Sequence, residues 1–389
     1  MRLSDYAVGR DNNFTLLRFS AAMTVLFAHS VAALGLPPER EFFYNRIGFS
    51  LGEMGLDMLF VTSGFLVTAS LLSRQDLIGY LWARALRVYP ALWVMLILMV
   101  FVLAPALTSL PRAEYYASAQ TWDYFRKCAT LIGGIRYSLP GVFETVPLKN
   151  EFNGSLWTMP VEVRMYLYLA AGWVVFAVVP GLRLRALSIV SPLAALIFLG
   201  IILYGRLGGG ALNGANIRIF MYLYGSSLFM WRAKVPMSAA LMLAILVALV
   251  CASFDKSVFF VAYACTLPLL VLHLVYLPGG PIRAFNNWGD LSYGVYIYAF
   301  PVQQTLALAF PGMSLLAMMA SSAVVSCGIG AISWNLLEKH ALALKDDFTR
   351  ATERALDRGL ALIWSRRRGD RALLRGSVEE ASAPIPPAE

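Results

Sequence analysis

The sequence predicts an all-α integral membrane protein with about ten transmembrane helices and both termini in the cytoplasm. Three observations predict this fold: an apolar composition, ten apolar runs of near-spanning length, and basic residues that gather on alternate connections. Of the 389 residues, 59% are hydrophobic and 14% are charged, and the mean hydropathy is +0.64. Soluble domains carry roughly 25% charged residues. The composition therefore excludes an ordinary soluble protein.

The apolar runs set the expected number of helices. A helix needs about 20 residues to cross the hydrocarbon core of a bilayer. Runs near that length lie at about 13–34, 52–72, 88–107, 156–179, 186–204, 216–231, 237–254, 257–277, 291–311 and 313–337. The first run lacks a small-residue cleavage site, so we expect it to remain as a membrane helix and not to be removed as a signal peptide.

Basic residues at the ends of the runs indicate the orientation. With the N-terminus inside, the cytoplasmic connections hold most of the short-loop basic residues, namely Arg74, Arg84, Arg87, Arg183, Arg185, Arg232, Lys234 and Arg283. An excess of Lys and Arg marks cytoplasmic loops, and anionic lipid attracts the same residues. The net charge of +9 is therefore interpreted as a topology signal, and not as a sign of nucleic-acid binding.

Two further segments complete the domain organisation. Within the membrane domain, 1–340, the connection 108–155 is too long for a simple turn. Its content of Tyr, Trp and Gly indicates a partly ordered outer structure that could cover or line a site. Residues 341–389 form a basic cytoplasmic tail, expected to be partly helical and then disordered. The four cysteines lack ligand spacing, so neither a disulfide scaffold nor a metal site is expected.

Ionisable residues at membrane depth usually face a protein interior or a wet cavity and mark function. Arg18 and His29 in the first run return to one helix face, about 16 Å apart along the axis. Glu53 and Asp57 share a face of the second run. In an antiparallel hairpin Glu53 lies near His29 in depth, which predicts a carboxylate and histidine pair with His29 as general base. A neutral histidine bonded to a backbone carbonyl is the alternative.

Further charges extend this arrangement into two layers. Arg84 and Arg87, at i and i+3, join Arg18 in an inner layer at the expected mouth of the third helix. Adjacent guanidiniums suit phosphate or pyrophosphate, although ordinary flanking by basic residues would give the same pattern. Glu162 in the fourth run belongs to the outer layer. It either faces a cavity or forms an ion pair with Arg164.

Small and aromatic residues have mainly structural interpretations. Ser63 and Gly64 in FVTSGF allow two helices to approach closely, although such a segment could also admit a ligand. Trp82 lies near a helix mouth, where tryptophan is typical of the interfacial belt.

Five motifs in order resemble the membrane acyltransferase 3 family of bacterial O-acyltransferases: LLRFSAAMTVLFAHS, GLDMLFVTSGFLV, RALRVYPALW, NGSLWTMPVEVRMYL and GDLSYGVYIYAFPV. The resemblance spans about residues 10–340. It implies a ten-helix enzyme that moves an acyl group, commonly acetyl from cytoplasmic acetyl-CoA, onto hydroxyls of surface or secreted carbohydrates. It implies that His29 is essential for transfer, that Arg18 is its paired arginine, and that Arg84 and Arg87 bind the acyl donor. Where many relatives have a histidine, this chain has Ala299, so that histidine's role is not carried over.

The residues and the resemblance together predict a mechanism. The inner arginines would hold the nucleotide end of CoA, and the pantetheine arm would reach toward His29. That histidine, oriented by Glu53, would activate a sugar hydroxyl arriving from the outer side. Asp57, Ser63 and Glu162 are candidate cavity-lining residues. The developing oxyanion needs a hydrogen-bond donor that the sequence does not name, and an acyl-histidine intermediate stays open.

The expected partners follow from the predicted mechanism. They are acetyl-CoA or another acyl-CoA as co-substrate, a carbohydrate acceptor such as exopolysaccharide or O-antigen, the lipid bilayer, and polysaccharide-assembly proteins. No bound cofactor, metal or nucleic acid is expected, and the expected location is the bacterial cytoplasmic (inner) membrane. The alternative is a proton-coupled transporter or flippase for a sugar-linked or anionic substrate, with His29, Glu53 and Glu162 as a proton relay.

Overall fold

The computed structural model describes residues 1–358 except residues 10, 42, 179–181 and 209–212. This part of the chain is all-helical, with no strand assigned in it. Six of its helical stretches are long and apolar enough to cross a membrane by length and composition, at Phe14–Ala33, Leu51–Arg74, Leu77–Leu107, Leu182–Leu207, Lys256–Tyr276 and Leu315–Arg358. The predicted all-α architecture with several helices of spanning length and apolarity is therefore confirmed for the described residues.

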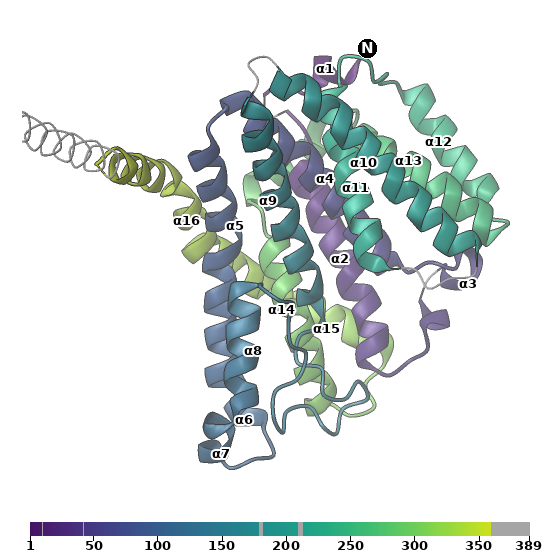
Figure 1. Cartoon of the computed structure of the whole chain (residues 1–389). Helices are drawn as coiled ribbons and strands as arrows, with labels where there is room; N and C mark the ends of the chain where they lie inside the picture. The colour runs from purple at the N-terminus through teal and green to yellow at the C-terminus, as the bar shows by residue number, and fades with distance from the viewer. Residues whose placement is uncertain (10, 42, 179–181, 209–212, 359–389) are drawn as a thin grey trace, which may run out of the picture.

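Each of the ten apolar runs overlaps a helix (Figure 1). These helices are α2 (Phe14–Ala33), α4 (Leu51–Arg74), α5 (Leu77–Leu98), α9 (Met159–Val175), α10 (Leu182–Leu207), α11 (Gly214–Met230), α12 (Ala239–Ala252), α13 (Lys256–Tyr276), α14 (Ser292–Ala309) and α15 (Leu315–Ser333). Because α9, α11, α12 and α14 fall outside the six stretches of spanning length and apolarity, the number of ten spans stays a prediction. The cytoplasmic position of both termini also stays a prediction.

Shorter elements join these helices. They are α1 (Leu3–Tyr6), α3 (Tyr44–Ile47), α6 (Ala104–Leu107), α7 (Arg112–Ala117), α8 (Ala119–Thr130) and α16 (Lys339–Ala343), with 3-10 turns at Pro38–Arg40, Gly154–Thr158, Phe176–Val178 and Gly280–Trp288 and π-helical turns at Met99–Leu103 and Trp334–Glu338. The helix that contains α16 continues, after a turn at residue 344, to residue 358. The remainder of the expected tail, 359–389, lies outside the described residues.

The start of the third helix differs from the prediction. The apolar pattern placed it at residue 88, but α5 begins at Leu77, where Asp76 Oδ1 accepts a hydrogen bond from Gly79 N at 2.8 Å. The prediction was wrong because Arg84 and Arg87 interrupt the apolar run, whereas in the fold both side chains line an internal cavity. The two arginines therefore lie roughly two to three turns inside the helix, and not at its mouth.

Close backbone contact joins α4 to α11. A Cβ atom added at Gly64 would lie 2.0 Å from the carbonyl oxygen of Tyr222, and one added at Gly225 would lie 2.2 Å from that of Val61. Glycine at both positions is therefore required by space. The expectation that Gly64 lets two helices approach closely is confirmed, and it fixes the neighbouring Ser63 at the cavity on the other side of α4.

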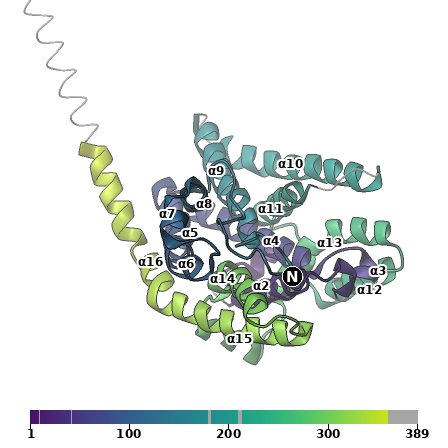
Figure 2. The same ribbon diagram turned by 90° about the horizontal axis from the view of Figure 1, so that it is seen from below.

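The central helices are α2, α4 and α14, as the view from below shows (Figure 2). α14 packs between α2 and α15, and nearly all its residues from Ser292 to Gln304 are buried. α5 and α8 lie on one side of this centre and α12 and α13 on the other. The residues of the central helices that face one another are thus shielded from the surrounding bilayer.

The long connection 108–155 is ordered by α7, α8 and a set of polar contacts at the end of the molecule away from the N-terminus (Figure 1). Asp123 accepts hydrogen bonds from Arg136 Nε at 2.5 Å and from Arg126 Nη2 at 2.9 Å, and these guanidiniums lower the pKa of its carboxyl. Gln304 Nε2 donates to the carbonyl oxygens of Leu148 and Glu151. These last bonds fasten the end of the connection to α14.

Candidate active site

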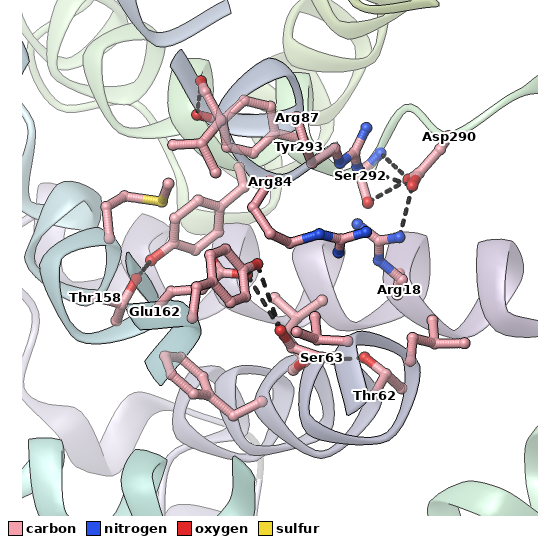
Figure 3. Close-up of a pocket in the computed structure, with 18 of the residues that line it drawn as sticks. Arg18, Thr62, Ser63, Arg84, Arg87, Thr158, Glu162, Asp290, Ser292 and Tyr293 are labelled. Atoms are coloured by element: carbon pink, nitrogen blue, oxygen red, sulfur yellow. Dashed lines mark hydrogen bonds and ion pairs between the residues drawn. The ribbon is translucent and has the colours of Figure 1, made fainter. Parts of the chain in front are cut away.

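A cavity of about 320 Å³ lies between α2, α4, α5, α9, α14 and the chain around α16. Five of the residues singled out from the sequence line it, namely Arg18, Ser63, Arg84, Arg87 and Glu162 (Figure 3). They come from four different helices. The fold therefore brings the inner arginines and the Glu162 carboxylate to one internal space.

Two of the arginines share one carboxylate. Arg18 Nη1 lies 2.7 Å from Asp290 Oδ2, and Arg87 Nη2 lies 2.8 Å from the same oxygen. Arg87 Nη1 also lies 3.2 Å from Glu338 Oε2. In the connection before α14, burial raises the pKa of Asp290, but Arg18, Arg87 and Ser292 outweigh burial and hold that pKa at about 2. Asp290 is therefore ionised at neutral pH and offsets part of the charge of both guanidiniums.

Arg84 differs from the other two arginines. Its buried Nε has no hydrogen-bond partner, and within the described part of the chain it forms no ion pair. Its guanidinium lies 5.8 Å from the centroid of the Tyr166 ring. A buried donor without a partner costs free energy, so this guanidinium has unused hydrogen-bonding capacity at the cavity wall.

Glu162 faces the cavity, which settles one of the alternatives left open by the sequence. Tyr166 OH donates a hydrogen bond to Glu162 Oε1, and Ser63 Oγ donates to the same oxygen at 3.4 Å. Arg164 Nε instead donates to the carbonyl oxygen of Pro160 at 3.1 Å. The Ser63 hydroxyl and the Glu162 carboxylate thus form one polar group on the cavity wall.

His29 lies outside the residues that line the cavity and is connected to it by hydrogen bonds. Its Nδ1 lies 3.3 Å from Ser155 Oγ. The carbonyl oxygen of Ser155 accepts a hydrogen bond from Tyr296 OH at 2.6 Å, and Tyr296 OH in turn lies 2.6 Å from Thr158 Oγ1. Because Tyr296 and Thr158 both line the cavity, two hydrogen-bonded residues separate the cavity from the imidazole.

The position of Ser155 is fixed by its neighbours. Asn153 Oδ1 accepts a hydrogen bond from Ser155 N at 3.2 Å, and Asn153 Nδ2 donates to the carbonyl oxygen of Ile297 on α14 at 2.9 Å. Phe300, also on α14, packs edge-on against the His29 ring, with centroids 5.2 Å apart. Residues 153–155 and α14 therefore contact the His29 imidazole from two sides.

The two carboxylates of the second run have other partners. Glu53 Oε2 accepts a hydrogen bond from Ser50 N at 3.3 Å and completes a capping box at the start of α4. Asp57 is fully buried in an ion pair with Arg218 and accepts a hydrogen bond from Tyr263 OH at 2.8 Å. Neither carboxylate is among the residues that line the cavity. The structure does not bring Glu53 into hydrogen-bond contact with His29, whose ring is bonded to Ser155 instead.

Sequence reasoning missed several residues of this site, above all Ser155, Asp290, Thr158 and Tyr296. Ser155 and Asp290 are polar residues at the start of predicted helices, in NGSLW and GDLSYG, and that position was the available signal. Their contacts join segments far apart in the chain, with His29 and Ser155 separated by 126 positions. Pattern and spacing within one helix do not report such contacts.

Comparisons with known proteins agree with the motifs. The family model described as an acyltransferase domain (acyltransferase 3) matches residues 11–336. The chain is 29% identical over 352 residues to an "O-acetyl transferase" of Shigella phage Sf6, covering 86% of this chain and 96% of the relative. It is 25% identical over 365 residues to "Nodulation protein 10" of Rhizobium leguminosarum bv. viciae, covering 88% and 96%. No solved structure matches the chain. With its membrane helices, its ordered motifs and a model match over most of its length, the chain belongs to the acyltransferase 3 family.

Proposed function

We propose that this membrane O-acyltransferase moves an acyl group, acetyl in the first instance, from cytoplasmic acyl-CoA to a hydroxyl of a cell-surface or secreted polysaccharide or its lipid-linked precursor, with His29 as general base. The observation that carries the proposal is the cavity itself. It holds an arginine with unused donor capacity, and it is linked by two hydrogen-bonded residues to the imidazole. A bacterial inner-membrane location follows, because the donor is cytoplasmic.

The donor side of the proposal rests on Arg84. Among the described residues the Arg84 Nε lacks a partner, whereas Arg18 and Arg87 are bonded to Asp290. Phosphate oxygens accept charge-assisted hydrogen bonds from guanidinium with good geometry. Arg84 would therefore make the direct contact with the diphosphate of the donor, while Arg18 and Arg87 add positive potential around it.

The transfer step uses His29. With Nδ1–H donating to Ser155 Oγ, the lone pair lies on Nε2, which takes the proton of the acceptor hydroxyl as its oxygen attacks the thioester carbonyl carbon. The C–O bond forms, the C–S bond breaks, and the proton passes from the imidazolium to the departing thiolate. This route gives an ester and free CoA, and it needs no further reactant. Ser155 takes the orienting role that the sequence assigned to Glu53.

The choice of acyl group and acceptor is supported by the relatives and the motifs. One relative bears the name O-acetyl transferase, which favours acetyl. The acceptor class, a carbohydrate, follows the resemblance of the five ordered motifs. Exopolysaccharide and O-antigen both have suitable hydroxyls.

The test measures CoA thiol released from acetyl-CoA by purified protein, with and without a surface-glycan fraction, together with acetyl esters formed on the glycan. We expect glycan-dependent release that is lost in His29→Ala. In Arg84→Gln we expect a KM for acetyl-CoA that rises about tenfold or more. Arg185→Gln, at the exposed start of α10, is the matched control for loss of one arginine.

The same assay separates the enzyme from the transporter alternative. Thioester turnover that requires both the glycan and His29 supports the acyltransferase. Absence of thioester turnover under all conditions, combined with glycan or proton flux that depends on His29 in proteoliposomes, would contradict it.

A further inference from the structure

The cavity wall continues beyond the family domain. The family model ends at residue 336, yet Leu342 and Lys345 also line the cavity. Both residues belong to the helical segment 339–358, which is called the C-terminal helix from here on. A complete donor site therefore includes side chains that the family motifs do not cover.

Specific contacts dock the C-terminal helix on α5. Trp82 Nε1 donates a hydrogen bond to Thr352 Oγ1 at 2.9 Å, and the rings of Trp82 and Phe348 lie 4.6 Å apart. The expected interfacial tryptophan is thus an anchor between two helices. Figures 1 and 2 show α16 crossing α5 before the chain leaves the bundle. Because Arg84 and Trp82 both lie on α5, this docking fixes the position of Lys345 relative to Arg84.

Lys345 holds its charge in a weak pair. Its Nζ lies 2.8 Å from Asp346 Oδ1, and the Asp346 side chain is 73% exposed while that of Lys345 is 17% exposed. Pairs with so exposed a partner contribute little to stability, so an incoming anion can replace Asp346. By contrast, Arg18 and Arg87 are bonded to the largely buried Asp290. Lys345 is thus a cation on the cavity wall, at a point where the wall meets solvent.

The size of the cavity indicates what reaches this point. Pockets for drug-sized ligands hold roughly 300–1,000 Å³, and this cavity, at about 320 Å³, lies at the small end. An acyl-CoA molecule is larger than such a ligand, so part of it stays outside. With the thioester directed toward His29, the part left at the mouth is the phosphorylated nucleotide.

We propose that Lys345 binds a phosphate of the nucleotide end of the acyl-CoA donor, and that the docked C-terminal helix forms the mouth of the donor site. This assignment rests on the proposed function. The binding energy comes from the charge-assisted contact, gained without disturbing the Asp290 pairs. Phosphate could be presented by the ribose or by the diphosphate, and the choice of donor in the assay distinguishes the two.

The experiment compares full-length wild type with Lys345→Gln, using acetyl-CoA, acetyl-dephospho-CoA and acetyl-pantetheine as donors. Lys339→Gln is the matched control, because Lys339 Nζ is exposed and bonded to Asn335 Oδ1. We expect Lys345→Gln to raise the KM for acetyl-CoA about tenfold at unchanged kcat, with acetyl-pantetheine unaffected. A rise that persists with acetyl-dephospho-CoA assigns the contact to the diphosphate, and one that disappears assigns it to the ribose phosphate.

A second variant tests the docking. Thr352→Val removes the hydrogen bond to Trp82 and keeps the shape of the side chain, so it should raise the KM for acetyl-CoA in the same direction. An unchanged KM in Lys345→Gln, or an equal rise with acetyl-pantetheine, would overturn the assignment of Lys345 while leaving the proposed function intact. Lack of turnover by wild type with all three donors would overturn both.

Discussion

Arg18 Nη1 lies 2.7 Å from Asp290 Oδ2, and this ion pair joins α2 to the connection before α14. The same oxygen is bonded to Arg87 of α5. One carboxylate therefore links three segments on the wall of the cavity. The pairing holds the positive charges of the inner layer in place before any substrate enters.

Replacing the Asp290 carboxylate tests how much its ion pairs contribute to stability. In Asp290→Asn the two guanidiniums lose their shared anion, and removal of one partner from a largely buried ion pair costs about 3 kcal/mol. We expect a lower Tm in detergent, by several degrees, together with lower acyl-CoA turnover. Asp346→Asn, which changes an exposed carboxylate, should leave the Tm unchanged. Equal Tm values for wild type and Asp290→Asn would show that the pairs contribute nothing.

The hydrogen bond between Ser155 and His29 predicts a specific kinetic effect. Ser155→Ala removes the group that orients the imidazole, so kcat should fall about 10- to 100-fold, less than the loss expected without the base. The KM for acetyl-CoA should stay near the wild-type value, because Ser155 lies outside the cavity lining. Ser188→Ala, which loses a hydroxyl that donates to the carbonyl oxygen of Arg185, is the control. A change in KM alone would contradict the orienting role.

The contact between α4 and α11 predicts intolerance of a single methyl group. Gly64→Ala would place a Cβ atom 2.0 Å from the carbonyl oxygen of Tyr222, so the two helices must separate. We expect a loss of stability of roughly 1–3 kcal/mol, measured as a lower Tm and a lower yield of folded protein. Gly200→Ala on α10, where no described atom beyond the surrounding helix backbone lies within 4 Å of the added Cβ, should be neutral or stabilising, since alanine favours helix over glycine. Similar Tm values for the two variants would refute the packing argument.

The buried pair of Asp57 and Arg218 calls for a double-mutant cycle. Asp57→Leu alone leaves the Arg218 guanidinium buried without its anion, which should cost about 3–5 kcal/mol. Arg218→Met alone should be similarly harmful. The double variant should recover much of the loss, because both charges are then absent. Thermal unfolding of the four proteins gives the coupling, and additive losses would mean that the two side chains act independently.

Much of the fold could be predicted because a membrane helix needs a long apolar run, which is visible in the sequence. The start of α5 could not be predicted, because Arg84 and Arg87 line an internal cavity that forms only when the helices pack together. The shared helix face of Arg18 and His29 stays a prediction from helical geometry within one segment. The bond from His29 to Ser155 depends on how the 108–155 connection returns to α14, which local spacing does not report.

Glu53 caps the start of α4, although its position in the sequence was interpreted as placing it beside His29. Ser50 and Glu53 have the spacing of a capping box, in which the glutamate bonds the backbone N–H at the helix start. The structure shows this bond. Depth in the membrane alone placed Glu53 beside His29, but the nearer backbone donor at Ser50 engages the carboxylate.

The glycine contacts between α4 and α11 also bear on how the two substrates of the proposed reaction would meet across a bilayer. Helices whose backbones touch cannot slide past each other without breaking that contact, so α4 and α11 move as one unit. Under the proposed function, passage of the acyl group then depends on the reach of the donor's flexible arm, and not on separation of α4 from α11. Under the same proposal, a donor with a shortened arm would bind at the arginines and still fail to react.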